Sequence, residues 1–128
     1  SFAGIVLDEV YLNLTEGYSE RDNNGQAMKY LNQLMLTRFK TGEVIPFTAT
    51  NKTQALAIIL AERRKSLIMR NLRWMDLKRL NLKDTHAETL SRKIGENTYQ
   101  LSPNDLRYAF LIPSGVIGMA PTINQNKR

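Results

Sequence analysis

The stretch that decides the fold is residues 51–82, which read NKTQALAIILAERRKSLIMRNLRWMDLKRLNL. Apolar residues recur in it at helical spacing, so it predicts the longest helix of the chain, over residues 49–82. Asn51 followed by Gln54 resembles a capping box, which is typical of a helix start. A single Trp on a helical stripe belongs to a hydrophobic core more often than to a sugar-stacking platform, so we expect a buried Trp74 ring. The stripe is formed by Leu56, Leu60, Leu67 and Trp74.

One interruption is expected in this helix. Asn71 is a poor residue for a helix interior, so a bend is predicted near residues 70–72. Arg63 lies on the apolar stripe, and a buried guanidinium needs a carboxylate or backbone carbonyls as partners. Asp76 lies three residues from both Arg73 and Arg79, which allows ion pairs along one helix face.

The charge of the chain is concentrated in the same region. Eight basic residues and two acids lie between Glu62 and Lys83, and this excess equals the net charge of +6 of the whole chain. A basic helix can bind phosphates or an anionic membrane. The alternative is a set of ion pairs that fixes the helix bend, and we favour it because the acids lie inside the basic run. The predicted ion-pair network consists of Glu62, Arg63, Arg73, Asp76 and Arg79.

Two shorter helices are predicted before this stretch, over residues 5–20 and 26–40. Asp-Asn-Asn-Gly at 22–25 is a turn signal, so the two helices form an antiparallel hairpin that resembles one tetratricopeptide unit and, with its following loop, spans residues 1–48. One such unit normally stacks on neighbours, so we expect an exposed apolar face and self-association. The apolar stripes are Leu7, Tyr11, Leu14 and Tyr18 in the first helix and Ala27, Leu31 and Leu34 in the second.

Residues 83–128 predict a loop-rich tail. Short extended segments are expected at 99–101 and 108–112, and no regular structure after Pro113. The apolar residues of this tail should pack on the helices as an ordered coil. The predicted fold is therefore mainly α, a single domain over residues 1–128 with a tetratricopeptide-like helical hairpin, a long bent helix, short extended segments and an irregular C-terminal tail.

The residues indicate neither catalytic nor metal chemistry. There is no cysteine, which excludes disulfides, thiolate nucleophiles and zinc-thiolate sites. His86 is the only histidine and lies in a polar link, where a solvated side chain is expected. Residues 22–25 depart from a calcium loop because the glycine comes fourth instead of sixth. We predict no enzyme activity, no cofactor and no metal, and the sequence assigns no ligand-binding residue.

Several segments match a set of known motifs, in the same order along the chain. The segments are Glu9–Leu12, Ala27–Arg38, Glu62–Leu67 with Arg73–Arg79, Tyr99–Pro113 and Asn124–Asn126. They resemble the motifs of the SusD/RagB family of glycan-binding outer-membrane lipoproteins, in particular its signatures ERRxEL…R..DLKR and Y.L.PND.RY.FPIP. Three positions depart from the family pattern. Val116-Ile117 stands where a Glu often precedes the Ile. Asn71-Leu72 stands where Glu-Gly is common, and Leu111 stands where Pro is favoured.

The resemblance covers about the C-terminal quarter of a family member. It implies a non-catalytic glycan- or nutrient-binding component of an outer-membrane uptake system at the cell surface, with a lipid anchor expected in an N-terminal part that precedes this segment. It implies a TonB-dependent porin as partner and an oligosaccharide or other nutrient as ligand. A helical protein-interaction module and, less favoured, a basic nucleic-acid-binding domain are the alternatives; we expect no nucleic-acid partner.

Overall fold

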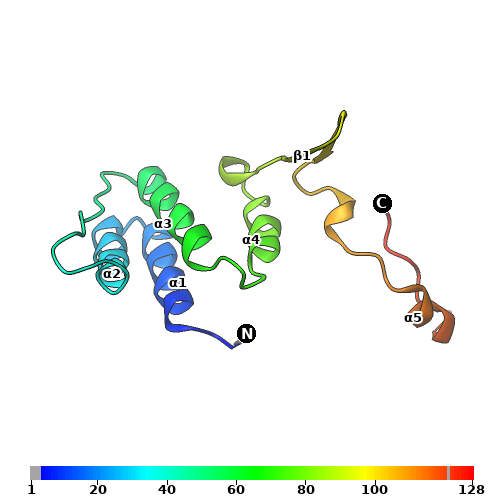
Figure 1. Ribbon diagram of the computed structural model, residues 1–128, viewed down its shortest axis with the longest axis horizontal. Helices are drawn as coiled ribbons and strands as arrows, with labels where there is room; N and C mark the ends of the chain where they lie inside the picture. Colours follow the sequence, from blue (N-terminus) through cyan, green and yellow to red (C-terminus); the bar gives the residue numbers. More distant parts are fainter. Residues whose placement is uncertain (1–3, 121) are drawn as a thin grey trace. The chain divides into compact units, whose positions relative to one another are not determined.

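Helices make up most of the regular structure in the computed structural model, which describes residues 4–120 and 122–128 (Figure 1). The predicted mainly-α fold is confirmed. The chain divides into two compact units, Ser1–Arg73 and Trp74–Arg128. The elements are α1 (Leu7–Glu20), α2 (Asn24–Leu36), α3 (Lys52–Ser66), α4 (Arg73–Leu80), β1 (Leu90–Ile94), β2 (Asn97–Leu101) and α5 (Ser114–Met119), with short 3₁₀ helices at Asp84–His86 and Leu106–Tyr108.

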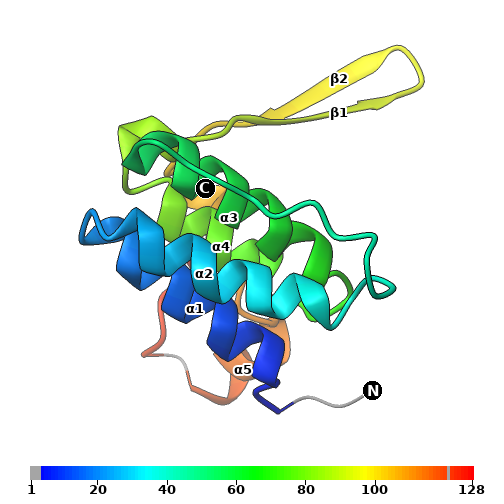
Figure 2. The same ribbon diagram turned by 90° about the vertical axis from the view of Figure 1, so that its left-hand side faces the viewer.

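The first unit is a bundle of α1, α2 and α3, in which α1 packs on both other helices (Figure 2). Its α1–α2 hairpin is the one that the sequence predicts. The link is short because Asp22 adopts a left-handed backbone, with φ of 60°, and Asn23 Oδ1 accepts the Gln26 N–H at 3.3 Å to cap α2. The core consists of Leu12, Ala27, Met28, Leu31, Leu34, Met35, Ala55, Ile59 and Leu67.

The buried face of α1 is not the predicted apolar stripe. Tyr11 and Tyr18 pack against the core, whereas Leu7 is 69% exposed and Leu14 is 40% exposed, so part of the stripe forms the exposed apolar face that the sequence predicts. The helix buries Leu12, Thr15, Glu16 and Ser19. The small side chains of Thr15 and Ser19 let neighbouring helices approach closely. The buried Thr15 hydroxyl has a hydrogen-bond partner within its own helix, because it donates to the Leu12 carbonyl at 2.9 Å. A prediction based on the spacing of apolar residues misses a buried helix face that consists partly of small polar residues.

The second helix follows the prediction more closely. Its predicted stripe of Ala27, Leu31 and Leu34 is buried. The helix ends at Leu36, earlier than residue 40, where the Thr37 hydroxyl donates to the Leu34 carbonyl at 2.7 Å. This bond satisfies one of the carbonyls that a helix end leaves open.

One asparagine anchors the loop between α2 and α3. The Asn32 side chain donates from Nδ2 to the Phe47 carbonyl at 2.9 Å, and its Oδ1 accepts the Phe47 N–H at 2.8 Å. The amide therefore pairs with both polar groups of one loop residue, as a neighbouring strand would. Phe47 is held against the core in consequence.

The predicted bent helix over residues 49–82 is interrupted across the break expected near residues 70–72, and the interruption is long enough to leave two separate helices. α3 starts as predicted, with Asn51 Oδ1 accepting the Gln54 N–H at 2.9 Å. α3 ends at Ser66 and α4 starts at Arg73. Met69 and Asn71 have φ angles of 62° and 59° in the intervening segment. These left-handed residues end the helical path, and the interruption includes the predicted bend.

The second unit contains an antiparallel β-hairpin. β1 pairs with β2 in a register from Leu90 opposite Leu101 to Ile94 opposite Asn97. The predicted extended segment 99–101 is part of β2 and is confirmed. Gly95, with φ of 59°, lies in the tight turn between the strands.

Three predictions for the tail are wrong, the first of them only in part. The predicted extended segment 108–112 begins inside a 3₁₀ helix, because Asp105 Oδ1 accepts the Arg107 N–H at 2.8 Å and caps a helical turn. Regular structure returns after Pro113, whose carbonyl accepts the Val116 N–H at 2.9 Å at the start of α5. Most of the apolar residues expected to be buried are exposed, namely Phe110, Leu111, Val116 and Met119.

Side-chain amides order the tail where hydrophobic burial does not. Gln125 donates to the Ile112 carbonyl and accepts the Ile112 N–H, both at 2.9 Å. Asn126 Nδ2 donates to the Phe110 carbonyl at 2.6 Å. The Gln-Asn pair near the end of the chain therefore ties that end to the segment 110–112.

The Asn32–Phe47 link can be tested by replacing Asn32 with alanine. Loss of two amide hydrogen bonds should lower the free energy of unfolding by about 1–2 kcal/mol. The Phe47 amide should also exchange its hydrogen faster, which NMR measures residue by residue. Gln33→Ala removes an exposed neighbouring amide and is the matched control. Equal Phe47 exchange in both variants would contradict the anchoring role of Asn32.

Candidate binding site in the C-terminal unit

The residues of the predicted ion-pair network lie in both units. Asp76 is 9% exposed on α4, and its Oδ1 lies 3.2 Å from Arg79 Nη2, as their spacing predicts. Glu62 is also buried and forms an ion pair with Lys65, a neighbour that the predicted set did not include. That the whole set acts as one network stays a prediction.

Arg63 is 7% exposed on α3 and has a partner that the sequence did not predict. Its Nη1 donates to Asn13 Oδ1 of α1 at 2.7 Å. An amide oxygen therefore takes part in satisfying this buried guanidinium. This bond ties the basic end of α3 to α1. Arg73 is half-buried at the start of α4.

The Pro-Asn-Asp turn connects two segments that lie far apart in the sequence. Asn104 takes a left-handed backbone, with φ of 59°, and its Nδ2 donates to the Asn81 carbonyl at 2.9 Å. Asn81 follows α4, and its own Oδ1 accepts the Glu88 N–H at 3.1 Å. These two bonds fix the backbone and side chain of Asn81. The sequence assigned no role to either asparagine, although Asn104 lies in the PND motif of the family signature.

An ion pair closes the same turn. Arg107 donates from Nε to Asp105 Oδ1 at 2.9 Å and from Nη2 to Asp105 Oδ2 at 2.7 Å. Its Nη2 also donates to the Gln100 carbonyl at 3.0 Å, which joins β2 to the turn. The side-chain and backbone hydrogen bonds from Arg107 lower the pKa of Asp105 from 3.8 to about 2.

An aromatic cluster lies beside this turn. The Trp74 ring centre is 4.8 Å from that of Tyr108 and 5.3 Å from that of Phe110, and Trp74 Nε1 donates to the Tyr108 carbonyl at 3.2 Å. Trp74 is half-buried and its ring partners come from residues 108–110, so the expectation of a ring buried among helices is wrong in part. Phe110 stacks on Trp74 with 17° between the ring planes and is 69% exposed.

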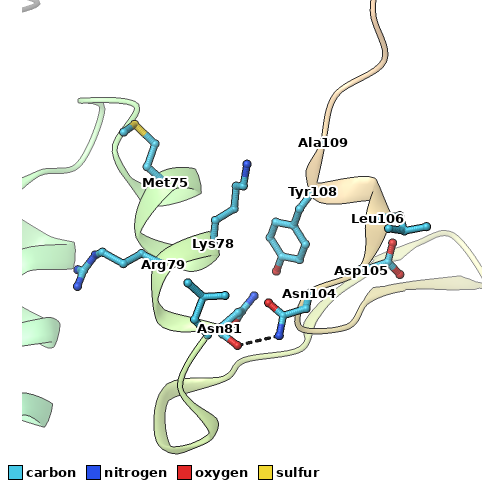
Figure 3. A pocket seen from close by; sticks show the side chains of 10 residues that line it. Met75, Lys78, Arg79, Asn81, Asn104, Asp105, Leu106, Tyr108 and Ala109 are labelled. Atoms are coloured by element: carbon cyan, nitrogen blue, oxygen red, sulfur yellow. Dashed lines mark hydrogen bonds between the residues drawn. The ribbon is translucent and has the colours of Figure 1, made fainter. Parts of the chain in front are cut away.

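A pocket of about 620 Å³ opens between the end of α4 and the 104–109 segment (Figure 3). Two of the side chains that line it, Asn81 and Tyr108, are only 3% and 5% exposed. Within residues 4–120 and 122–128, neither Asn81 Nδ2 nor the Tyr108 hydroxyl has a hydrogen-bond partner. The pocket is lined by Met75, Lys78, Arg79, Asn81, Leu82, Asn104, Asp105, Leu106, Tyr108 and Ala109.

Other parts of the described chain offer less chemistry. A hollow of about 250 Å³ in the first unit lies beside Asn13 and Tyr18. His86 is half-buried in a 3₁₀ helix, and no group of three or more metal-ligating side chains occurs among the described residues. Nor does any helix in the part of the chain that the structure describes have the length and apolar character needed to cross a membrane.

The Asp76–Arg79 pair predicts a measurable contribution to stability. Asp76→Ala removes a buried carboxylate and should lower the free energy of unfolding by about 1–3 kcal/mol, because Arg79 loses a charged hydrogen bond but keeps access to water. Asp84→Ala is the control, since Asp84 is an exposed acid just beyond the same helix. If the two variants unfold at the same urea concentration, Asp76 has no structural role.

The lowered pKa of Asp105 predicts how the turn responds to acid. A carboxyl with a lowered pKa in the folded state stabilises the fold above its ordinary pKa of 3.8, and this contribution is lost as the pH falls through about 2. An NMR titration of the Asp105 carboxyl carbon should find the midpoint near 2. In Arg107→Gln the midpoint should return toward 3.8. Lys93→Gln removes an exposed charge from β1 and is the control, in which the Asp105 midpoint should stay near 2. If the midpoint also stays near 2 in Arg107→Gln, Arg107 is not the cause of the lowered pKa.

Comparison with known proteins identifies the family that these motifs indicate. No curated protein sequence matches the chain. The family model described as SusD family matches residues 7–127, which is nearly the whole chain. The matched range includes every motif segment that was identified from the sequence, from Glu9–Leu12 to the Gln-Asn pair near the end. The family expected from the sequence motifs is therefore confirmed: the chain belongs to the SusD family, whose members are glycan- or nutrient-binding components at the outer membrane.

Proposed function

We propose that this chain is part of a non-catalytic protein that captures a glycan at the cell surface and delivers it to a TonB-dependent porin. The observation that carries the proposal is the family match over residues 7–127. A surface location through a lipid anchor belongs to the same proposal, as does the oligosaccharide nature of the nutrient. Binding alone, without chemical change of the ligand, is the activity that we assign.

The exposed face of Phe110 is the contact that we propose for a sugar ring. An aromatic ring packs well against the apolar face of a sugar, and one side of Phe110 is already covered by Trp74. The stacking holds the Phe110 ring in place, and its 69% exposure leaves the other side open to a ligand. Asn126 supports this position by donating to the Phe110 carbonyl.

The proposal is tested by a glycan array, followed by calorimetric titration of the oligosaccharides that bind. Phe110→Ala should weaken binding about ten-fold, because it removes the stacking surface. Phe39→Ala is the matched control, since Phe39 is a similarly exposed ring, 57% accessible, in the first unit. If Phe110→Ala binds the oligosaccharide as tightly as the unmodified chain, Phe110 is not the sugar contact. Absence of any glycan binding by the chain and by a longer protein that contains it would overturn the function.

The partner is tested separately. Purification of the tagged protein from the outer membrane of its source should recover a TonB-dependent porin at a fixed ratio. Because the proposal assigns Phe110 to the sugar and not to the porin, Phe110→Ala should leave this association intact. Recovery of the protein without any porin would contradict this part of the proposal.

A second function, a helical protein-interaction module, has its own supporting observation. The first turns of α1 and the segment before it expose Ile5, Leu7, Val10 and Leu14, at 77%, 69%, 48% and 40%. Apolar side chains that gather on one face commonly mark a protein contact. Sedimentation of the chain tests the predicted self-association. A monomer at all concentrations would contradict self-association, and Leu7→Lys should dissociate any dimer that forms through this face.

A further inference from the structure

Two buried polar groups without partners line the same pocket of the second unit. Among the described residues, Asn81 Nδ2 and the Tyr108 hydroxyl make no hydrogen bond, although their residues are 3% and 5% exposed. Figure 3 shows the Tyr108 hydroxyl turned toward Asn81 and Asn104. Buried donors are almost always satisfied in folded proteins, because an unpaired one loses its bonds to water without replacement. A bound molecule with an acceptor oxygen would satisfy both.

Both groups are held rigidly by bonds from their other atoms. Asn81 Oδ1 accepts the Glu88 N–H at 3.1 Å, and this bond fixes which end of the amide carries the free N–H groups. The Tyr108 ring lies 4.8 Å from the Trp74 ring, whose Nε1 donates to the Tyr108 carbonyl. Neither side chain can turn away to find a partner without breaking these contacts. The donors are therefore preorganised for a ligand.

The charges around the pocket favour an anionic ligand. Arg79 pairs with Asp76, and Asp105 pairs with Arg107. Lys78 is exposed, lines the pocket, and makes no ion pair among the described residues. Figure 3 places its side chain next to the Tyr108 ring. The uncompensated charge at this pocket is therefore one ammonium group, at the end of a long, flexible side chain that lines the same pocket as the two neutral donors.

The rest of the pocket is mainly apolar. Met75, Leu82, Leu106 and Ala109 contribute to its walls, and its volume of about 620 Å³ is within the range of pockets that bind small organic molecules. One positive charge and two fixed donors in such a pocket match a molecule with one carboxylate on an apolar body. An uncharged sugar would leave Lys78 without a partner and would place many hydroxyl groups against apolar walls.

We propose that this pocket binds a small apolar carboxylate, at a site separate from the exposed face of Phe110. The carboxylate accepts hydrogen bonds from Asn81 Nδ2, the Tyr108 hydroxyl and the Lys78 ammonium, and the apolar body lies against Met75 and Leu82. No bond is formed or broken, so the site is a binding site and not a catalytic one. The proposal does not rest on glycan binding.

The experiment titrates the whole chain with sodium octanoate, with octan-1-ol and octanamide as neutral probes of the same length. Trp74 is the only tryptophan and packs on Tyr108, so its fluorescence reports on the pocket. We expect saturable octanoate binding, confirmed by calorimetry, and at least ten-fold weaker binding of both neutral probes. Equal binding of octanoate and octan-1-ol, or no octanoate binding, would overturn the proposal.

Two variants assign the binding to the named donors. Tyr108→Phe removes only the hydroxyl, so it should weaken octanoate binding about ten-fold while the urea midpoint stays the same or rises, because the lost group has no partner in the fold. Lys78→Gln should weaken octanoate about ten-fold and leave octan-1-ol unaffected. Lys93→Gln, which removes an exposed charge from β1, is the control. Unchanged affinity in Tyr108→Phe and Lys78→Gln would overturn the proposal.

A crystal structure with octanoate separates the remaining outcomes. Carboxylate density beside Asn81 and Tyr108 supports the site. A single water molecule bridging these two groups, with octanoate absent from the pocket, overturns it. Phe110→Ala should leave octanoate affinity within two-fold of the unmodified chain, so failure of the glycan proposal and failure of this one are distinguishable.

Discussion

The left-handed backbone at Met69 and Asn71 is the constraint on which the rest of the structure depends. An uninterrupted helix through residues 52–80 would satisfy its own hydrogen bonds, and only a positive φ at these positions ends it early. Asparagine enters this region at a smaller cost than other side chains, because its amide can bond locally. The SusD family commonly has glycine in this segment, and Asn71 shows how the interruption forms without one. The break separates α3, whose Leu56 and Ile59 are buried, from α4, whose Trp74 starts the second unit.

Side-chain amides form hydrogen bonds with the backbone in several segments that lack regular secondary structure. Asn32 holds the loop after α2, Asn104 holds the turn after β2, and Gln125 holds the segment before α5. Asn32 and Gln125 each donate to and accept from one backbone residue, as a neighbouring strand would, and Asn104 donates one bond. This explains how the second unit keeps an ordered chain with few buried apolar side chains. Its hairpin is exposed along nearly its whole length, and an isolated hairpin of this size is only marginally stable.

Sequence reasoning succeeded where the determinants were local. The α1–α2 hairpin, the Asn51 cap and the strand residues 99–101 follow from spacing and turn chemistry within a few positions. It failed where distant contacts decide. The burial of Thr15 in place of Leu14 depends on which helices pack against α1, and the exposure of Phe110 depends on bonds from Asn126. The pocket could not be predicted at all, because Asn81 and Tyr108 are far apart in the sequence. The PND motif around Asn104 was recognised, but its partner after α4 was not.

The link between Asn81 and Asn104 gives a physical reason for two family motifs to occur together. One motif forms α4, and the other forms the turn and the 3₁₀ helix that follow β2. The Asn104 amide bonds the chain just after α4, and the Trp74 indole on α4 bonds the Tyr108 carbonyl after the turn. Each motif therefore supplies a donor for a backbone carbonyl of the other segment. A change in either segment would leave a carbonyl of the other unpaired, so the motifs form one structural unit. The polar groups that this unit does not use for its own fold are left to line its pocket, namely the Lys78 ammonium, Asn81 Nδ2 and the Tyr108 hydroxyl.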